Sequence, residues 1–134
     1  MIFHINRATY NATLSEEQRR AGLEMLRQTG ADNPAVKSYV VGPEFGGEFE
    51  YGAVYVLEDL DSYWQYLEHP THVHLELTGM EFIERFEVVD ITNSEDPEIG
   101  DKIAQLQVRH MEAHPDIAAL VAEVPSFTVP EGKG

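Results

Sequence analysis

A His-Pro step at residues 69–70 interrupts the middle of this chain and restricts how the segments around it can fold. Proline supports the start of a helix but disfavours its continuation, because it lacks an N–H group and its ring clashes with the preceding turn. The segment before the step is predicted to be a short helix that ends at Leu67 and is capped by Asp59 or Asp61. The segment after it is predicted to be a second helix over residues 71–85.

Four other segments have the apolar alternation or the β-branched composition of strands. They are residues 2–10, 36–41, 51–57 and 86–92. A helix is predicted between the first two strands, because Ser15 and Gln18 have the spacing of a capping box and Gly30 is a natural stop. The resulting order is β-α-β-β-α-β, so the sequence predicts an α+β chain with the ferredoxin-like fold.

One face of the predicted sheet should lie bare, because the helices of such a fold cover only the other face. Phe3, Ile5, Val89 and Ile91 alternate in phase with the uncovered face. A bare apolar face of this kind needs a partner. We therefore expect a homodimer that is joined through the sheet face.

The chain continues beyond the closing strand of this pattern. We divide it into a domain of residues 1–94, a helical C-terminal arm of residues 95–124 and a loose tail of residues 125–134. Asp96 is predicted to cap the first helix of the arm, and Pro115 is predicted to break that helix. The sequence leaves open whether the arm docks on its own domain or on the partner subunit.

Composition excludes several classes of partner. The 134 residues suffice for one domain and carry 9 basic against 24 acidic side chains, a formal net charge of −15. Nucleic acids and anionic membranes both favour basic surfaces, so neither is expected as a partner. The sequence has no cysteine, no signal-peptide pattern and no apolar run of transmembrane length. We therefore expect a cytoplasmic protein without disulfides or thiolate metal sites.

The stretch from Tyr66 to Val73 is an aromatic-rich turn followed by His-Pro-x-His. It lies between a strand that ends at Leu57 and a closing strand that carries Asp90. This arrangement resembles the stress-responsive A/B barrel (Dabb) family over residues 1–92. The resemblance implies a dimeric α+β barrel with the ferredoxin-like fold.

The same resemblance implies a site. His4, Tyr66, His72 and Asp90 stand where plant polyketide cyclases of this family carry their reactive residues. In those enzymes a tyrosine and a histidine form the acid–base pair of an aldol cyclisation that needs no metal and no organic cofactor. The resemblance therefore implies a small apolar or β-keto thioester ligand and no cofactor for this chain.

The chemistry of these side chains suits such a role. An imidazole, here that of His72, can act as a general base near neutral pH, and Asp90 is expected to orient it. The phenol of Tyr66 can donate a hydrogen bond to a developing enolate or alkoxide. His4 is expected to bind the substrate, and Trp64 to help wall the cavity.

Two functions remain open from the sequence. One is a small-molecule pocket protein that acts as a cofactor-independent cyclase or lyase. The other is a non-enzymatic, stress-responsive oligomer, in which the His-Pro-x-His turn only joins helix ends to the last strand. A cavity that ends at His72 would favour the first function. A pocket filled by Trp64, Phe82 and the C-terminal arm would favour the second.

Clustered histidines raise the question of a metal site. His69, His72 and His74 lie close together, and His110 and His114 share one helical face at i and i+4. The second pair lacks the His-Glu-x-x-His order of zinc peptidases, and His110 continues an apolar stripe that is typical of packing. We therefore expect no functional metal, only adventitious divalent cations at the acidic surface.

Overall fold

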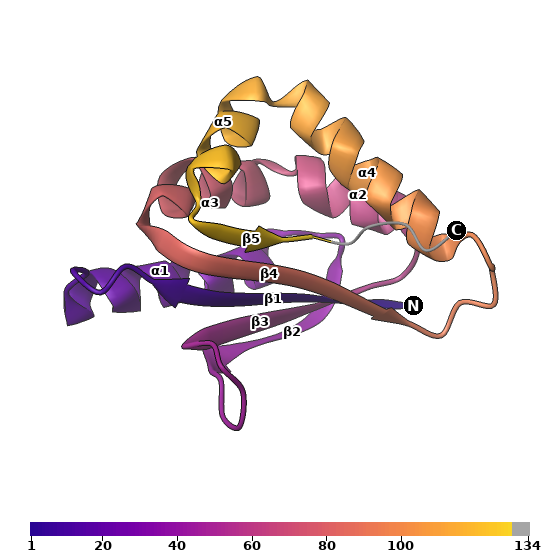
Figure 1. Cartoon of the computed structure of the whole chain (residues 1–134). Helices are drawn as coiled ribbons and strands as arrows, with labels where there is room; N and C mark the ends of the chain where they lie inside the picture. The colour runs from indigo at the N-terminus through magenta and orange to yellow at the C-terminus, as the bar shows by residue number, and fades with distance from the viewer. Residues whose placement is uncertain (130–134) are drawn as a thin grey trace.

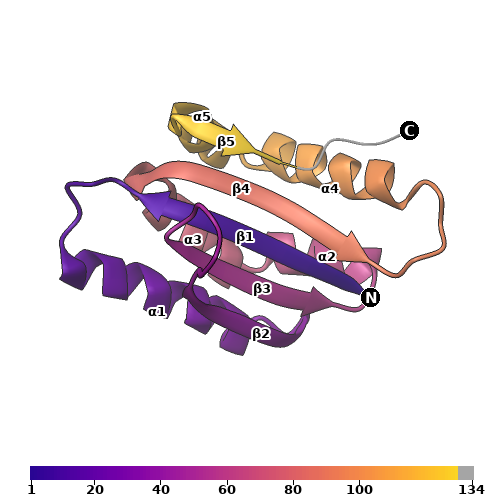
Figure 2. The ribbon, with the colours of Figure 1, turned by 60° about the horizontal axis from the view of Figure 1, so that its bottom comes forward.

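The structure is a computed structural model that describes residues 1–129 of the chain. Its five strands form one sheet in the order β2-β3-β1-β4-β5, which Figure 2 shows from its open side. The strands are β1 (Ile2–Tyr10), β2 (Val36–Pro43), β3 (Tyr51–Leu57), β4 (Ile83–Thr92) and β5 (Ser126–Thr128). Neighbouring strands are antiparallel except β5, which runs parallel to β4.

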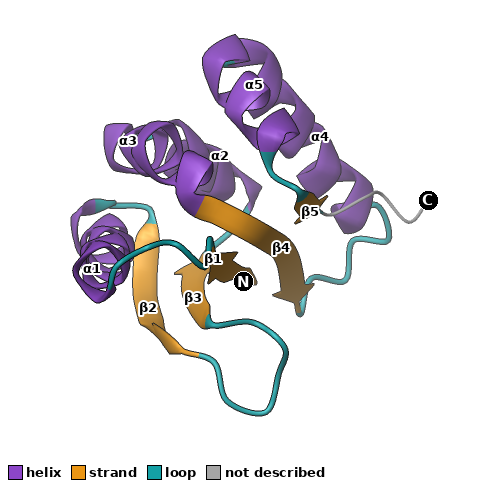
Figure 3. Cartoon of the chain, turned by 60° about the vertical axis from the view of Figure 1, so that its left-hand side comes forward, coloured by secondary structure: helices purple, strands orange, loops and turns teal. Residues whose placement is uncertain are grey.

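The helices gather on one side of this sheet (Figure 1, Figure 3). They are α1 (Glu16–Asp32), α2 (Leu60–Glu68), α3 (Pro70–Gly79), the 3₁₀ turn η1 (Met80–Phe82), α4 (Ile99–Ala113) and α5 (Pro115–Glu123). Up to β4 the chain order is β-α-β-β-α-β, with the second helix in two pieces. The predicted ferredoxin-like α+β fold is therefore confirmed. Within residues 1–129, no helix combines the length and the apolar character that crossing a membrane requires.

Among residues 1–129, no helix lies on the opposite face of the sheet (Figure 2), and part of this face is apolar. Phe3 of β1 pairs with Ile91 of β4, and Ile5 pairs with Val89, so the four side chains share this face as predicted. Ile91 is 61% exposed and Phe3 is 43% exposed in the single chain. An apolar surface of this extent calls for a covering partner.

Local signals in the sequence define several helix starts. Ser15 and Gln18 form the predicted capping box of α1. Asp59, rather than Asp61, caps α2, because its carboxylate accepts the backbone N–H of Ser62 at 2.9 Å. At the His-Pro step, the ring of His69 accepts the backbone N–H of Thr71 at 3.2 Å, and Pro70 occupies the first turn of α3. The break between α2 and α3 lies where the sequence predicts it.

The predicted boundary between the second helix and the closing strand is wrong. α3 ends at Gly79 rather than at residue 85, and β4 begins at Ile83 rather than at Phe86. Ile83 already pairs with Tyr10 of β1. Helix propensity amounts to tenths of a kcal/mol per residue, so sheet hydrogen bonds and burial outweigh it over residues 83–85.

Gly30 also has a different role from the predicted helix stop, because α1 runs on to Asp32. The ring of Tyr39 on β2 packs directly over it. A Cβ atom on residue 30 would lie 2.4 Å from Cγ of Tyr39, closer than van der Waals contact allows. The glycine therefore permits a close approach of helix to strand.

Gly30→Ala is expected to lower the free energy of unfolding by about 1–3 kcal/mol, because the Tyr39 ring must move to admit the methyl group. The matched control is Gly79→Ala at the end of α3, where an added Cβ meets nothing within 4 Å. This control should be neutral or slightly stabilising, since alanine favours helix more than glycine does. Urea denaturation of both variants measures the difference, and equal stabilities would show that Tyr39 yields without cost.

The C-terminal arm docks on its own domain, with α4 against α2 and α5 against α3. α4 begins at Ile99 after Glu98, so the predicted cap at Asp96 is wrong. The carboxylate of Asp96 instead accepts the backbone N–H of Glu98 at 2.9 Å, and Asp96 lies two residues before the N-cap position of the helix. Pro115 breaks the arm as predicted and starts α5.

The residues after the arm were expected to form a loose tail, but Ser126–Thr128 form β5 beside Arg85–Glu87 of β4. The ring of Phe127 stacks on that of Phe86 with centroids 5.3 Å apart, and this contact gives the short strand an apolar anchor. The rest of the expected tail, from residue 130, lies outside the described residues.

Candidate active site

A cavity of about 230 Å³ lies between the sheet, α1 and α3. Most of its wall is apolar, and its polar members are few. The apolar wall includes Ala8, Leu14, Met25, Leu26, Ala53, Leu75, Met80 and Phe82. Its polar lining includes Asn6, Gln18, Glu76 and Thr78, together with Tyr66 and His72, whose rings pack against each other. Ligand cavities of drug size start at about 300 Å³, so this one suits a compact, largely apolar molecule.

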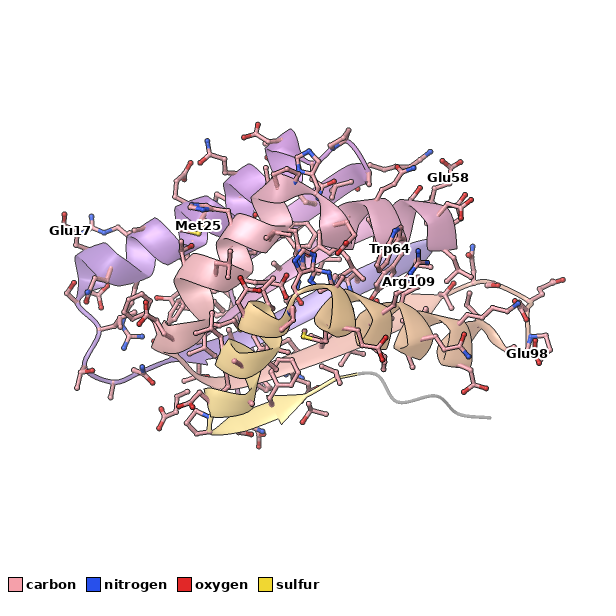
Figure 4. All side chains as sticks on the ribbon, turned by 90° about the horizontal axis from the view of Figure 1, so that it is seen from above. Glu17, Met25, Glu58, Trp64, Glu98 and Arg109 are labelled. Carbon is pink, nitrogen blue, oxygen red and sulfur yellow. The ribbon has the colours of Figure 1, made fainter. Side chains whose placement is uncertain are left out.

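The described residues that line the cavity fall between Asn6 and Phe86, so the arm is neither a lid nor a plug for it. Phe82 belongs to the wall without filling the space. Trp64 lies elsewhere, beneath the guanidinium of Arg109 on α4, whose central carbon is 4.1 Å from the ring centroid (Figure 4). Trp64 therefore anchors the arm and does not wall the cavity as expected.

His72 presents one free ring nitrogen. Its Nδ1 atom lies 2.8 Å from the carbonyl oxygen of Leu67, at the end of α2. A carbonyl oxygen can only accept, so Nδ1 carries a proton, and Nε2 has the lone pair in the neutral form of the ring. Within residues 1–129, no group hydrogen-bonds Nε2. The break at the His-Pro step thus places an imidazole with an unpaired Nε2 at the cavity.

Tyr66 presents an unpaired donor beside it. In the described part of the chain, Oη of Tyr66 is the buried side-chain polar atom that lacks a hydrogen-bond partner. The Tyr66 and His72 rings lie 4.6 Å apart between centroids. Burial, followed by the neighbouring Tyr55, raises the pKa of Tyr66 well above its ordinary value against a smaller opposing effect of the nearby Asn6 side chain, so its hydroxyl stays protonated. The pair therefore offers a base and a donor at one end of the cavity.

Asp90 does not orient His72, contrary to the sequence-based expectation. Its carboxylate lies 2.8 Å from Nδ1 of His4 and accepts the hydroxyl of Tyr63 at 3.0 Å. Gln107 of α4 in turn donates to the Tyr63 hydroxyl at 2.8 Å. β1 and β4 pair His4 directly with Asp90, which is why the two side chains meet.

His4 is also not a wall of the cavity. Its side chain is 2% exposed, and its ring packs edge-on against Tyr66 at 5.2 Å between centroids. The buried hydroxyl of Tyr63 completes the cluster, and burial and the Asp90 charge raise the pKa of Tyr63 well above its ordinary value. The cluster of His4, Tyr63 and Asp90 therefore supports Tyr66 on the side away from the cavity and does not contact a ligand.

The group that accompanies His72 is Glu76, one turn further along α3. Oε1 of Glu76 lies 3.1 Å from Nδ1 of His72 and 2.7 Å from Nε2 of His110. His110 comes from α4 and is fully buried, and its Nδ1 lies 2.5 Å from Glu68. His114 also contacts Glu68, at 2.9 Å. A continuous polar chain thus runs from the cavity through the arm toward the surface.

The charges of this network follow from its hydrogen bonds. Burial alone would raise the pKa of Glu76, but the neighbouring His72 and the hydrogen bond of His110 outweigh it and lower that pKa to about 2. Burial alone would raise the pKa of Glu68, but His110 and His114 lower it. Burial alone would lower the pKa of His110, but Glu76 and Glu68 raise it. Two ionised carboxylates can only accept, so both ring nitrogens of His110 donate and the ring is an imidazolium.

Two groups of side chains in residues 1–129 have the composition of a metal site. They are His72 with Glu76 and His110, and Glu68 with His110 and His114. Two ligands of a tetrahedral zinc ion lie about 3.3 Å apart, since each is about 2.0–2.1 Å from the ion. The His110 contacts of 2.5 and 2.7 Å are shorter and are those of charge-assisted hydrogen bonds. The geometry fits shared protons better than an ion.

Sequence reasoning brought Tyr66 and His72 together but missed the roles of Glu76, Tyr63 and Gln107. Glu76 carries a signal that could have been used, because it stands four residues after His72 on the same helical face. Tyr63 and Gln107 carry no such signal, since only the packing of α4 on α2 brings them into contact.

Fold and site together define a class of protein, namely a ferredoxin-like α+β domain with a small, largely apolar cavity that is lined by a tyrosine and a histidine. The family model of the stress responsive A/B barrel domain (Dabb) matches residues 2–93, and the chain belongs to this family. The C-terminal arm lies outside the matched region. A search of curated proteins by sequence found no match.

Solved structures share the fold. A dimeric ferredoxin-like protein of unknown function from Thermobifida fusca is 23% identical, covers 68% of this chain and 89% of its own, and has a TM-score of 0.62. A Dabb family protein from Mesorhizobium loti is 21% identical, with coverage of 69% and 96% and a TM-score of 0.61. A hydroxynitrile lyase from Passiflora edulis is 15% identical, with coverage of 70% and 94% and a TM-score of 0.63. At these identities the likeness shows the fold alone.

Proposed function

We propose that this chain binds a small apolar carbonyl compound in the cavity and moves a proton beside the carbonyl, as a cofactor-independent lyase or cyclase of the aldol type. One observation carries the proposal, namely the Oη of Tyr66, which no described residue hydrogen-bonds, on a ring that packs at 4.6 Å between centroids against the ring of His72. A buried hydroxyl without a partner costs about 1–3 kcal/mol. The carbonyl oxygen of a ligand would supply the missing acceptor.

The proposed reaction needs only these two groups. Nε2 of His72 takes a proton from the carbon beside the carbonyl, and the electron pair of that C–H bond moves to form an enolate. Tyr66 donates its hydrogen bond to the enolate oxygen as the negative charge develops there. The enolate carbon then attacks a second carbonyl, and the proton on Nε2 passes to the new alkoxide. In the reverse direction, the same steps cleave a carbon–carbon bond.

The comparisons support this class of chemistry without fixing a substrate. One structural neighbour is named a hydroxynitrile lyase, and cleavage of a hydroxynitrile also removes a proton while a carbon–carbon bond beside an oxygen breaks. The small volume of about 230 Å³ favours a compact ligand over a long chain.

We also propose that the protein is a homodimer joined through the open face of the sheet. The apolar pairs Phe3–Ile91 and Ile5–Val89 lie on that face, where the single chain leaves them without cover. Neighbours from Thermobifida fusca and Jannaschia are described as dimeric ferredoxin-like proteins. Both observations support a sheet-to-sheet pair.

The elementary step can be tested without knowing the substrate. Acetophenone is compact and apolar, and its methyl group exchanges hydrogen for deuterium slowly at neutral pH without a catalyst. We expect the purified protein to accelerate this exchange in D₂O, followed by proton NMR, and the acceleration to saturate with ketone concentration. If aryl ketones, aliphatic ketones and β-keto thioesters neither bind in native mass spectrometry nor exchange, the non-enzymatic oligomer becomes the better interpretation.

Tyr66→Phe is expected to separate function from stability. Removing the hydroxyl should lower the exchange rate by about 10²–10³-fold, because the enolate loses its donor. The same change should leave the free energy of unfolding unchanged or raise it by about 1 kcal/mol, because the lost hydroxyl has no partner to leave behind. Denaturant titration and the exchange assay on one preparation measure both. A destabilised variant with normal exchange would contradict the proposal.

A further inference from the structure

An imidazolium is buried where the C-terminal arm meets the domain. His110 has no solvent exposure and lies between Glu76 of α3 and Glu68 of α2. A charge in such a position is costly unless it is fully paired, so its presence calls for an explanation. The family match ends at residue 93, so the arm supplies this charge from outside the matched domain.

We propose that the C-terminal arm completes the site: His110 takes up the charge of Glu76 and thereby holds His72 in the neutral form that can accept a proton. The inference rests on the proposed function, in which His72 is the base. His110 contacts Glu76 rather than the cavity, so it is a positioning residue and not a catalytic one.

The carboxylate of Glu76 faces two histidines through one oxygen. A carboxylate paired with His72 alone would stabilise the imidazolium form of His72 and occupy the base with a proton. His110 lies closer to the shared oxygen, at 2.7 Å against 3.1 Å for His72. The positive charge of the network is therefore placed on the arm, and the carboxylate is satisfied without protonating the base.

Repulsion between like charges strengthens the effect. The rings of His72 and His110 lie 5.4 Å apart between centroids. Two positive charges at this distance in a buried site repel strongly, so a charged His110 opposes a second charge on His72. The carbonyl of Leu67 meanwhile keeps the proton of His72 on Nδ1, the nitrogen that also faces Glu76.

Charged or titratable groups on three helices face His110. Glu68 comes from α2, Glu76 and His72 come from α3, and His114 follows one turn along α4. Arg109, the adjacent cation, points away and lies over Trp64 (Figure 4). Two carboxylates thus surround one imidazolium, and the cavity histidine is left neutral.

The first test reads protonation directly and needs no substrate. In the full chain labelled with ¹⁵N-histidine, long-range ¹H–¹⁵N NMR at pH 7 should show His110 with both ring nitrogens protonated. His72 should appear as the neutral tautomer with the proton on Nδ1. A neutral His110, or a charged His72 at this pH, would overturn the inference. So would stoichiometric Zn²⁺ binding that disappears in His110→Gln, since His110 would then be a ligand.

The second test uses His110→Gln, which can still donate one hydrogen bond to Glu76 but carries no charge. We expect the pH at which acetophenone exchange reaches half its maximum to move upward by about 1 unit or more, because His72 then pairs with Glu76 and holds its proton to higher pH. The variant should regain most of its exchange above that pH. This recovery would separate a positioning effect from simple loss of structure.

The matched control is His114→Gln, one turn along α4, whose ring contacts Glu68 but not Glu76. Its pH profile should follow that of the wild type. If the wild type accelerates acetophenone exchange but the pH profile of His110→Gln is not shifted, the inference is overturned and the proposed function stays intact. Absence of exchange in the wild type would instead remove the proposed function, while the NMR result would still decide which histidine carries the charge.

Discussion

His72→Asn is expected to lower kcat/KM for ketone exchange by about 10²–10⁴-fold, the usual contribution of a general base. Asparagine places an N–H group where Nδ1 of histidine lies, so it can keep the hydrogen bond to the Leu67 carbonyl, which measures 2.8 Å in the native protein. It removes Nε2, which no group within residues 1–129 hydrogen-bonds. The variant therefore tests the base without dismantling the junction between α2 and α3.

The matched control for this change is His74→Asn on the same helix, where the side chain is exposed. It should retain wild-type exchange. Thermal and urea denaturation complete the comparison, and His72→Asn should stay within about 1 kcal/mol of the wild type because its buried hydrogen bond is retained. If His72→Asn exchanged normally but unfolded several kcal/mol more easily, His72 would be a structural residue and the base would have to be sought elsewhere.

Most of the fold was predictable because its signals are local. The capping box at Ser15, the cap at Asp59 and the proline at residue 70 each act through neighbours a few residues away, and each lies where the sequence places it. The failures occur where distant contacts decide. Residues 83–85 have helical periodicity but pair with β1, and Phe127 is drawn into a strand by Phe86.

The sequence predicts that Tyr66 and His72 lie close together in the candidate site, but it does not predict which residues contact them. Tyr66 and His72 are six residues apart across a fixed turn, so the sequence alone brings them close together. Asp90 lies on the neighbouring strand, and its partner depends on register, which pairs it with His4 rather than with His72. In the sequence, His110 continues an apolar helical stripe. Only the docking of α4 places it between two carboxylates.

Ile91→Glu is expected to convert the proposed dimer into monomers, raising the dissociation constant by at least about 100-fold. The side chain is 61% exposed in the single chain and lies beside Phe3 on the apolar part of the open face. In a symmetric pair the change buries two carboxylates without a cation, and the cost of several kcal/mol corresponds to a shift of this size. Sedimentation velocity at micromolar concentration measures it.

Val108→Glu is the matched control, because Val108 is 58% exposed on the outer side of the arm and a carboxylate there should leave the dimer intact. Each chain already carries a formal net charge of −15, so two subunits repel each other and the apolar face must outweigh that repulsion. Added salt should therefore tighten the wild-type dimer, since it screens the repulsion and leaves the hydrophobic contact in place. A wild-type chain that stays monomeric at high protein and high salt concentration would show that this face has another occupant.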